Sequence, residues 1–360
     1  MRAFWIPSSS MSSTLNIRRA ISSAVSSGYD AVIAPLAIGA RSDSDSFDAG
    51  EELLREARER GVAAHLSVTV NMVASADELP ASRDHVIYQH PEWLMVPRQI
   101  ATEMLTIDAR SPAYLGRMAR WTRANVDRVA GLYVSPLDPA ATQYLVNAVV
   151  TAVGRYAVDG VFLDAVEFPG EDFDYSRETL EAFRRSIIPD LSDAERGRYE
   201  ARAEAEPLLY TRAFPERWRA FRVDHLTDLL TQLRETVRTA RPGAVVSAAV
   251  APDPVEAARR LQDWPAWLAK GLIDVVCPMA STTDSAAFAS QMAAAREAAG
   301  RHPLWVGIGA SSLSHEQIMD DILAARRIGA GGVGFSYDSL TAPARGSGYL
   351  SRLGKAAFSF

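Results

Sequence analysis

Four acidic side chains follow short apolar segments that have the composition of buried β-strands. They are Asp164, Glu167, Asp253 and Asp338. A carboxyl group can donate a proton when protonated, and can attack carbon or activate water when ionised. Glycoside hydrolysis needs two such groups at one site. The four acids are therefore candidate catalytic residues.

Each acid also has a purely structural interpretation. Asp164 could cap a backbone amide or pair with an arginine, and Glu167 could form a salt bridge on its loop. Asp253 lies between two prolines, a pattern typical of turns. The odd spacing of Asp164 and Glu167 puts them on opposite faces of an ideal strand, so they can share a site only if the chain bends after Ala165.

Eight short apolar segments alternate with helical periodicity, which predicts parallel strands joined by helical crossovers. We expect an α/β fold, a (β/α)8 TIM barrel, with Asp164 at the carboxyl end of the fourth strand, where barrels place their chemistry. The expected strands are 3–6, 31–34, 63–68, 160–164, 245–250, 273–277, 304–308 and 332–335. Helices are expected at 51–60, at 216–240, and at 314–328, which begins with the capping-box pair Ser314 and Gln317.

Length and composition favour one domain over residues 1–360, since 48% of the 360 residues are hydrophobic. Two connections are unusually long: 71–138 after the third strand and 170–215 after the fourth. Long loops on a rigid scaffold are usually functional, so we expect these insertions to lie over the barrel mouth. The charged stretch 193–206 within the second is expected to be a solvated helix.

Several classes of function are disfavoured. The net charge is −6 with no basic stripe, which argues against nucleic acid. No apolar stretch is long enough to cross a bilayer, and Arg2–Ile6 is expected to be a strand because it lacks the features of a signal peptide; a leader removed from the chain stays possible. Cys277 lies in an apolar run and is expected to be buried. The histidine spacing predicts no metal site, we expect no cofactor, and compartment and oligomeric state stay open.

Aromatic and polar side chains near strand ends and in the first long loop are candidates for binding a sugar, because sugars pack their apolar ring faces on aromatic rings. We expect Trp218 and Trp267, at helical spacing, to be core instead. The substrate-binding candidates are Trp5, His65, Asn71, His90, Trp93, Asp263, Trp264, Trp305 and Tyr337.

Several segments together resemble the glycoside hydrolase-like 10 family of bacterial proteins related to (β/α)8 glycosidases. The matching segments, in chain order, are Arg2–Trp5, Arg60–His65, His90–Leu94, Leu132–Pro136, Arg155–Asp164, Trp218–Arg219, Asp263–Trp264, Trp267–Leu268 and Leu272–Met279. This resemblance spans nearly the whole chain. It implies a retaining-type glycosidase architecture with the strand-four acid at Asp164, and a bacterial polysaccharide as substrate.

The chain departs from the family pattern at two places. After Asp164 the family usually has another acid or an aromatic residue and then an arginine, whereas this chain has Ala165, Val166 and Glu167. After the sixth strand the family commonly has glutamine and tyrosine, whereas this chain has Met279 and Ala280. The identity of the substrate therefore cannot be inferred from the family.

Our leading hypothesis is a glycoside hydrolase of the retaining type that acts on a bacterial or environmental oligo- or polysaccharide. In this hypothesis Asp164 is the nucleophile or electrostatic stabiliser and Glu167 is the proton donor, with Asp253 and Asp338 in reserve. Two alternatives stay open: a non-catalytic glycan-binding barrel, and a barrel lyase or isomerase that acts on a phosphorylated metabolite.

Overall fold

The chain folds into a closed barrel of eight parallel strands, as the sequence predicts. The computed structural model describes residues 1–35, 47–280, 282–346 and 348–358. The strand order around the barrel is β1-β10-β9-β8-β7-β6-β3-β2. The bounds are β1 (Arg2–Trp5), β2 (Ala31–Pro35), β3 (Ala63–Thr69), β6 (Gly160–Asp164), β7 (Val245–Val250), β8 (Val275–Ala280), β9 (Trp305–Ile308) and β10 (Gly332–Ser336). The largest shift is in β8, which starts two residues later than expected and continues to Ala280, whereas β1 starts and ends one residue earlier than expected.

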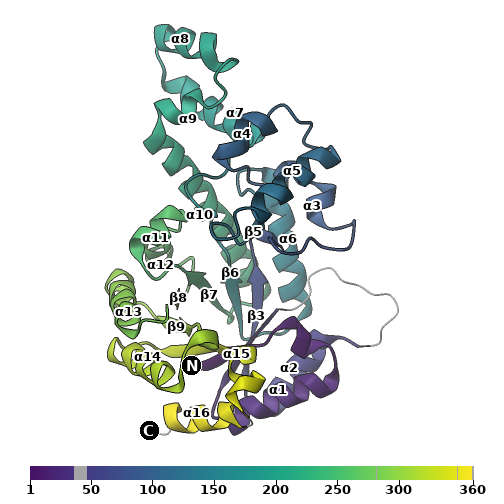
Figure 1. The fold of residues 1–360 in the computed structure, drawn as a ribbon, viewed down its shortest axis with the longest axis vertical. Helices are drawn as coiled ribbons and strands as arrows, with labels where there is room; N and C mark the ends of the chain where they lie inside the picture. The colour runs from purple at the N-terminus through teal and green to yellow at the C-terminus, as the bar shows by residue number, and fades with distance from the viewer. Residues whose placement is uncertain (36–46, 281, 347, 359–360) are drawn as a thin grey trace.

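Helices pack around the outside of the barrel (Figure 1). They are α1 (Thr14–Ser26), α2 (Ala49–Glu59), α6 (Pro139–Arg155), α10 (Pro215–Ala240), α11 (Pro254–Arg259), α12 (Trp264–Ala269), α13 (Ser285–Ala299), α14 (His315–Arg327), α15 (Tyr337–Thr341) and α16 (Tyr349–Phe358). The predicted capping box forms at the start of α14, where Ser314 and Gln317 bond each other's backbone amides. No helix among the described residues has the length and apolar character needed to cross a membrane.

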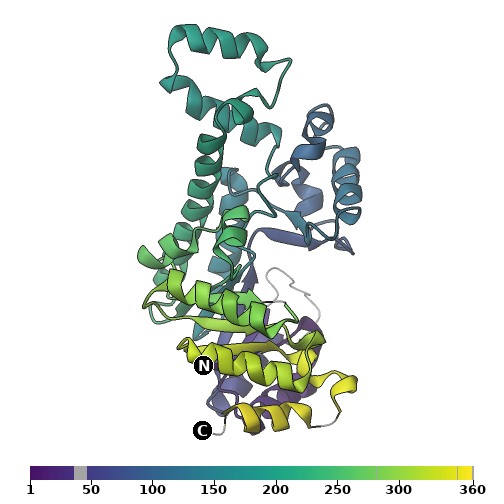
Figure 2. The same cartoon turned by 60° about the vertical axis from the view of Figure 1, so that its left-hand side comes forward.

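Both long connections leave the carboxyl ends of barrel strands. The first, after β3, contains β4 (Met72–Ser75) and β5 (Gly131–Tyr133), which pair antiparallel, and α3 (Val86–Gln89), α4 (Ala101–Met104) and α5 (Pro112–Arg123). The second, after β6, contains α7 (Arg177–Ile187), α8 (Asp193–Ala203) and α9 (Leu209–Ala213). Figures 1 and 2 show these helices standing away from the barrel, with α8 farthest from it. None of the residues of α8 is buried, as expected for a solvated helix.

The barrel interior is a separate small core of its own. It contains Ala3, Ala31, Ile33, Phe162, Ala249 and Cys277, with Met1, Trp5, Ala63 and Trp305 packed against them. These residues alternate along their strands with residues that face the helices, as the two-residue period of a strand requires. Cys277 is buried here, as expected.

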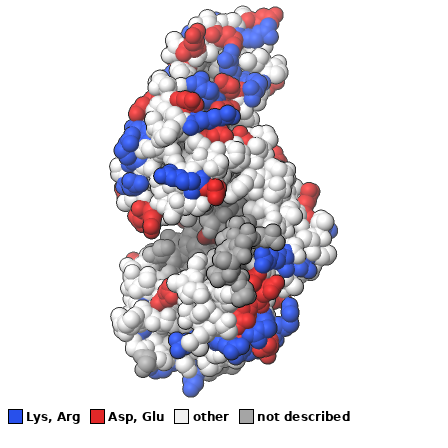
Figure 3. All heavy atoms as spheres, turned by 90° about the vertical axis from the view of Figure 1, so that its right-hand side faces the viewer, with Lys and Arg blue, Asp and Glu red and all other residues white. Residues whose placement is uncertain are grey.

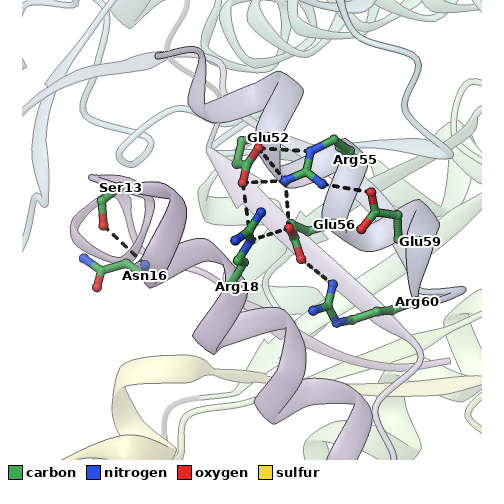
Figure 4. A network of polar contacts seen from close by, with 8 residues as sticks. All are labelled: Ser13, Asn16, Arg18, Glu52, Arg55, Glu56, Glu59 and Arg60. Carbon is green, nitrogen blue, oxygen red and sulfur yellow. Dashed lines mark hydrogen bonds and ion pairs between the residues drawn. The ribbon is translucent and has the colours of Figure 1, made fainter. Parts of the chain in front are cut away.

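A network of charges joins α1 to α2 on the barrel's outer layer (Figure 4). Glu56 is only 1% exposed, and its carboxylate accepts hydrogen bonds from Arg18, Arg55 and Arg60. Burial alone would raise the pKa of Glu56, but the bonds from Arg18 and Arg60 outweigh it and hold the pKa below its usual value. The buried charge is therefore fully compensated, which lets α2 pack tightly against α1.

Gly160 marks a point where the barrel tolerates no side chain. A Cβ at this position would lie 2.3 Å from the His65 ring and 2.8 Å from the backbone oxygen of Val245. We predict that Gly160→Ala lowers the free energy of unfolding by roughly 1–3 kcal/mol, the usual cost of overpacking. Chemical denaturation measures this. Gly154→Ala on α6 is the control, since a Cβ there meets nothing within 4 Å; an equal loss in both variants would contradict the prediction.

Candidate active site

Asp164 lies at the carboxyl end of β6 and faces the barrel interior. Phe162, two residues earlier, belongs to the interior core, so the strand period puts Asp164 on the same face. The carboxylate accepts a hydrogen bond of 2.9 Å from the amide of Ala165. Burial raises the pKa of Asp164, and that single amide bond opposes the rise only in part. Asp164 is thus a desolvated carboxyl group with no cation among the groups that shift its pKa.

The chain bends directly after Asp164. Ala165 has φ +49°, in the left-handed region that residues with a side chain rarely adopt. The bend is held from β3, because the amides of Val70 and Asn71 donate to the carbonyls of Asp164 and Ala165. The odd spacing of Asp164 and Glu167 therefore no longer separates their side chains as it would in an ideal strand.

Glu167 is held by three donors from distant parts of the chain. Its Oε1 accepts from Arg260 Nη1 at 2.9 Å and from the Tyr133 hydroxyl at 3.5 Å, and its Oε2 accepts from Gln262 Nε2 at 3.2 Å. Its side chain is 11% exposed. Burial raises the pKa of Glu167, whereas the Arg260 guanidinium opposes that rise and favours the ionised form.

Arg260 and Gln262, which donate hydrogen bonds to Glu167, lie on either side of a second backbone bend. Leu261, between Arg260 and Gln262, has φ +58°. Within the described chain, Ala165 and Leu261 are the two residues other than glycine with positive φ. The two backbones are also joined directly, because the amide of Phe168 donates to the carbonyl of Arg260. Strained backbone of this kind concentrates at functional sites, and here both bends adjoin one carboxylate.

The charges of Asp164 and Glu167 interact. Burial is the main cause of the raised pKa of Glu167, and Arg260 opposes it. The charge of the Asp164 carboxylate raises this pKa further. Burial also raises the pKa of Tyr133, and both carboxylates add to the rise. The Tyr133 hydroxyl is thus within electrostatic range of both acids, and the two carboxyl groups belong to one site.

An apolar floor lies beside Asp164 at the mouth. The indole of Trp5, at the end of β1, contacts Phe162 at 5.4 Å and lies over Gly334, where a Cβ would come within 2.6 Å of the ring. Met279 covers Gly307 in the same way and is 39% exposed. The glycine-rich segment around Gly334 therefore makes room for Trp5 within β10 and does not open a helix as a phosphate cradle would.

Two predicted binding residues, His65 and Trp305, pack on each other inside the barrel. His65 lies four residues before Thr69, which pairs with Asp164, so it is roughly 13 Å below that level along the strand. Its ring meets Trp305, the first residue of β9, at 5.6 Å. Burial lowers the pKa of His65 to about 4. Both rings pack inside the barrel, and their contribution to a sugar site stays a prediction.

Two more aromatic candidates pack elsewhere. Trp264 is fully buried in the main core, and its indole Nε1 has no hydrogen-bond partner among the described residues. Tyr337 packs on Phe4, at 5.2 Å, on the outer side of β1. Trp264 therefore has no exposed ring face, whereas Tyr337 is half-buried. Trp218 and Trp267 are buried, as expected.

The remaining predicted acids are exposed at helix starts. Asp253 caps α11, with its Oδ1 accepting from the amides of Val255 and Glu256. Asp338 lies in the first turn of α15, and Asp263 precedes α12. The hydrogen bonds of Asp253 are therefore those of a helix-capping residue, and they need no catalytic role to explain them.

The predicted residues of the first insertion divide into two groups. Asn71 is fully buried beside the bend, where its Nδ2 donates to Val134 and its Oδ1 has no partner in the described chain. His90 stacks on Trp93 at 3.9 Å within the insertion, so this pair is part of the insertion's own packing. Asn71 joins the site through the loop that fixes Ala165.

Arg260 and Gln262 are site residues that sequence reasoning missed. They are more than 90 positions from Glu167, on a short segment after α11 with no motif to mark it. Tyr133, which donates its hydroxyl to Glu167, lies 34 positions before it.

The surface is hollowed between the barrel and the insertion. Figure 3 shows this hollow on one face of the molecule, with acidic side-chain atoms visible at its floor.

Over the described residues, no group of three or more His, Cys, Asp or Glu side chains is arranged to hold a metal ion.

A closed eight-stranded barrel with two interacting carboxyl groups at the mouth is the architecture of many glycoside hydrolases, and solved structures of this class match the chain. The PgaB (BpsB) glycoside hydrolase domain of Bordetella bronchiseptica is 16% identical, with a TM-score of 0.60 over 98% of this chain and 97% of that one. The β-amylase catalytic domain of Paenibacillus polymyxa is 9% identical, with a TM-score of 0.61 over 95% and 93%. A β-galactosidase of Marinomonas ef1 is 11% identical, with a TM-score of 0.63 over 93% and 54%.

The chain belongs to the glycosyl hydrolase-like 10 family, whose model matches residues 98–321. This match confirms the family expected from the sequence. No curated protein matches the chain.

The strain at Ala165 gives a direct test of the bend. We predict that Ala165→Val lowers the free energy of unfolding by about 1–3 kcal/mol, because a branched side chain is strained at positive φ. Ala165→Gly removes the strain and should leave stability unchanged or slightly higher. Denaturant unfolding of both variants checks this, and a Gly variant as unstable as the Val variant would refute the bend.

Asp164 gives a prediction for stability against pH. Because its pKa is raised in the folded state, the group favours folding below its unfolded pKa of about 4, and this contribution is lost as pH rises through the folded pKa. We therefore predict that Asp164→Asn melts at a higher temperature than wild type at pH 7, with the difference vanishing below about pH 4. Thermal scans across pH measure this; a variant less stable than wild type at pH 7 would show that the carboxylate is paired.

Proposed function

We propose that this protein hydrolyses glycosidic bonds in an oligo- or polysaccharide at the mouth of the barrel. The observation that carries the proposal is the pair of interacting carboxyl groups, Asp164 and Glu167, in two different environments. Family membership and the fold of the similar structures support it. Hydrolysis needs one carboxyl group that holds a proton and one that is ionised, and different environments are how a protein separates the two roles.

The environments favour the reverse of the roles that the sequence suggested. Asp164 is desolvated without a cation, so it is the better proton donor to the leaving oxygen. Glu167 accepts a hydrogen bond from the Arg260 guanidinium, which favours the ionised form that a nucleophile needs. We propose that Glu167 attacks the sugar carbon while Asp164 protonates the leaving group, and that Asp164 then takes a proton from water as water releases the sugar. Two displacements at the same carbon give net retention of configuration.

Trp5 and Met279 form the apolar surface on which we place the sugar ring next to the cleaved bond. An aromatic ring beside an acid suits a sugar, which has an apolar ring face and polar edges. The Tyr133 hydroxyl, near both acids, is placed to hydrogen-bond the substrate or the attacking carboxylate.

The proposed roles predict different responses to the leaving group. Asp164→Asn should cut kcat for unactivated oligosaccharides by about 10²–10⁴, the usual contribution of a general acid, and should affect dinitrophenyl glycosides far less, since that leaving group needs no proton. Glu167→Gln should abolish turnover of both. Steady-state kinetics on the two substrate types, with NMR of the first-formed anomer, measures this.

Glu235→Gln on α10 is the control, because it removes an exposed carboxylate that is not among the hydrogen-bond partners of Asp164 or Glu167. Equal turnover of oligosaccharides by wild type and Asp164→Asn would contradict the proposed mechanism. Glycan binding with no turnover by wild type over a broad panel would instead identify a non-catalytic glycan-binding barrel.

A further inference from the structure

A second cavity lies in the insertion, apart from Asp164 and Glu167. It has a volume of about 360 Å³ and is enclosed by residues 104–110 on one side and by the start of α7 on the other. This volume is at the lower end of small-molecule sites, roughly 300–1,000 Å³. Its walls combine apolar side chains, among them Val96, Met104 and Ile107, with carboxyl and hydroxyl groups.

This cavity holds one buried polar group without a partner in the described chain, and a buried tyrosine. Tyr114 is 3% exposed and lines the cavity. Glu92 also lines it; its Oε1 meets His90 Nδ1 at 3.0 Å, but its Oε2 is buried with no partner in the described chain. A buried acceptor without a donor keeps its desolvation cost uncompensated, so a bound molecule that supplies hydroxyl donors would recover this energy.

The charges of the lining restrict the ligand. Three carboxyl groups, of Glu92, Asp108 and Glu178, face two guanidinium groups, of Arg110 and Arg177. Arg177 is already engaged, since it donates to the carbonyl of Leu105. The excess of carboxylates disfavours phosphate and other anions, and a neutral molecule with several hydroxyls on an apolar ring fits both the polar groups and the walls.

We propose that this cavity is an accessory saccharide-binding site, which holds a sugar unit of the polymer whose cleavage we assign to the barrel mouth. The identity of the ligand rests on that proposed function. The cavity is linked to the mouth by backbone: Val96 accepts from Tyr175, and its neighbour Met95 donates to Tyr133, whose hydroxyl bonds Glu167. A chain held at both places would be anchored for cleavage.

The test uses neutral malto-, cello- and galacto-oligosaccharides of two to six units. Binding is measured by calorimetry with the full chain in the Glu167→Gln background, in which we expect no turnover. Tyr114→Phe and Glu92→Gln are expected to weaken binding about tenfold and to raise KM for the longer saccharides, with kcat on aryl monoglycosides unchanged. Tyr199→Phe on α8 and Glu235→Gln are matched controls and should bind as the parent does.

A second readout does not depend on activity. Ala109 lines the cavity, and the native Cys277 is buried, so Ala109→Cys creates a thiol for maleimide labelling at this site. Bound saccharide is expected to slow labelling, and the labelled protein should lose the binding.

The proposal is overturned if no saccharide of the panel binds at millimolar concentration, or if Tyr114→Phe, Glu92→Gln and the labelled protein all bind as the parent does. Failure of the proposed function is separate, because it appears as unchanged turnover in Asp164→Asn. Saccharide binding at the cavity would still be measured in that case.

Discussion

The bend at Ala165 is the constraint on which the site depends. An ideal strand would direct Asp164 and Glu167 to opposite faces, and one residue at φ +49° removes that separation. The bend is held by hydrogen bonds from Val70 and Asn71 on the adjacent strand end. The second bend, at Leu261, delivers Arg260 and Gln262 to the same glutamate. Strain that the barrel tolerates at its mouth thus brings two acids together in unlike surroundings.

The barrel and the insertions contribute different parts of the proposed binding surface. The barrel strands fix Asp164, Trp5 and Met279 along a rigid rim. The first insertion returns through β5 to bring Tyr133 to Glu167, and its helices enclose the cavity around Tyr114. A rigid scaffold with long connections at one end is how one fold hosts many substrates, because the connections can change while the strand ends stay in place.

The sequence predicted what depends on local periodicity. Short apolar runs and their punctuation were enough for all eight strands and for the long helix α10. The family followed from ordered motifs and is confirmed. The placement of Asp164 also followed, because a strand end is a local feature.

Contacts between distant segments could not be predicted in this way. Arg260 reaches Glu167 across 93 positions, and no local pattern marks either partner. The exposure of tryptophans could not be predicted either. Trp5 and Trp264 both lie near the ends of elements, yet Trp264 is fully buried and Trp5 is not. The packing of neighbouring elements decides this difference.

The most direct measurement of the central claim is the site of covalent trapping. A 2-deoxy-2-fluoro glycoside with a good leaving group slows release of the glycosyl enzyme, so fragmentation mass spectrometry of the labelled peptide can locate the bond. The account predicts the sugar on Glu167, with trapping retained in Asp164→Asn. A label on Asp164 would contradict it, and so would wild-type turnover that releases an inverted anomer with no trapped species.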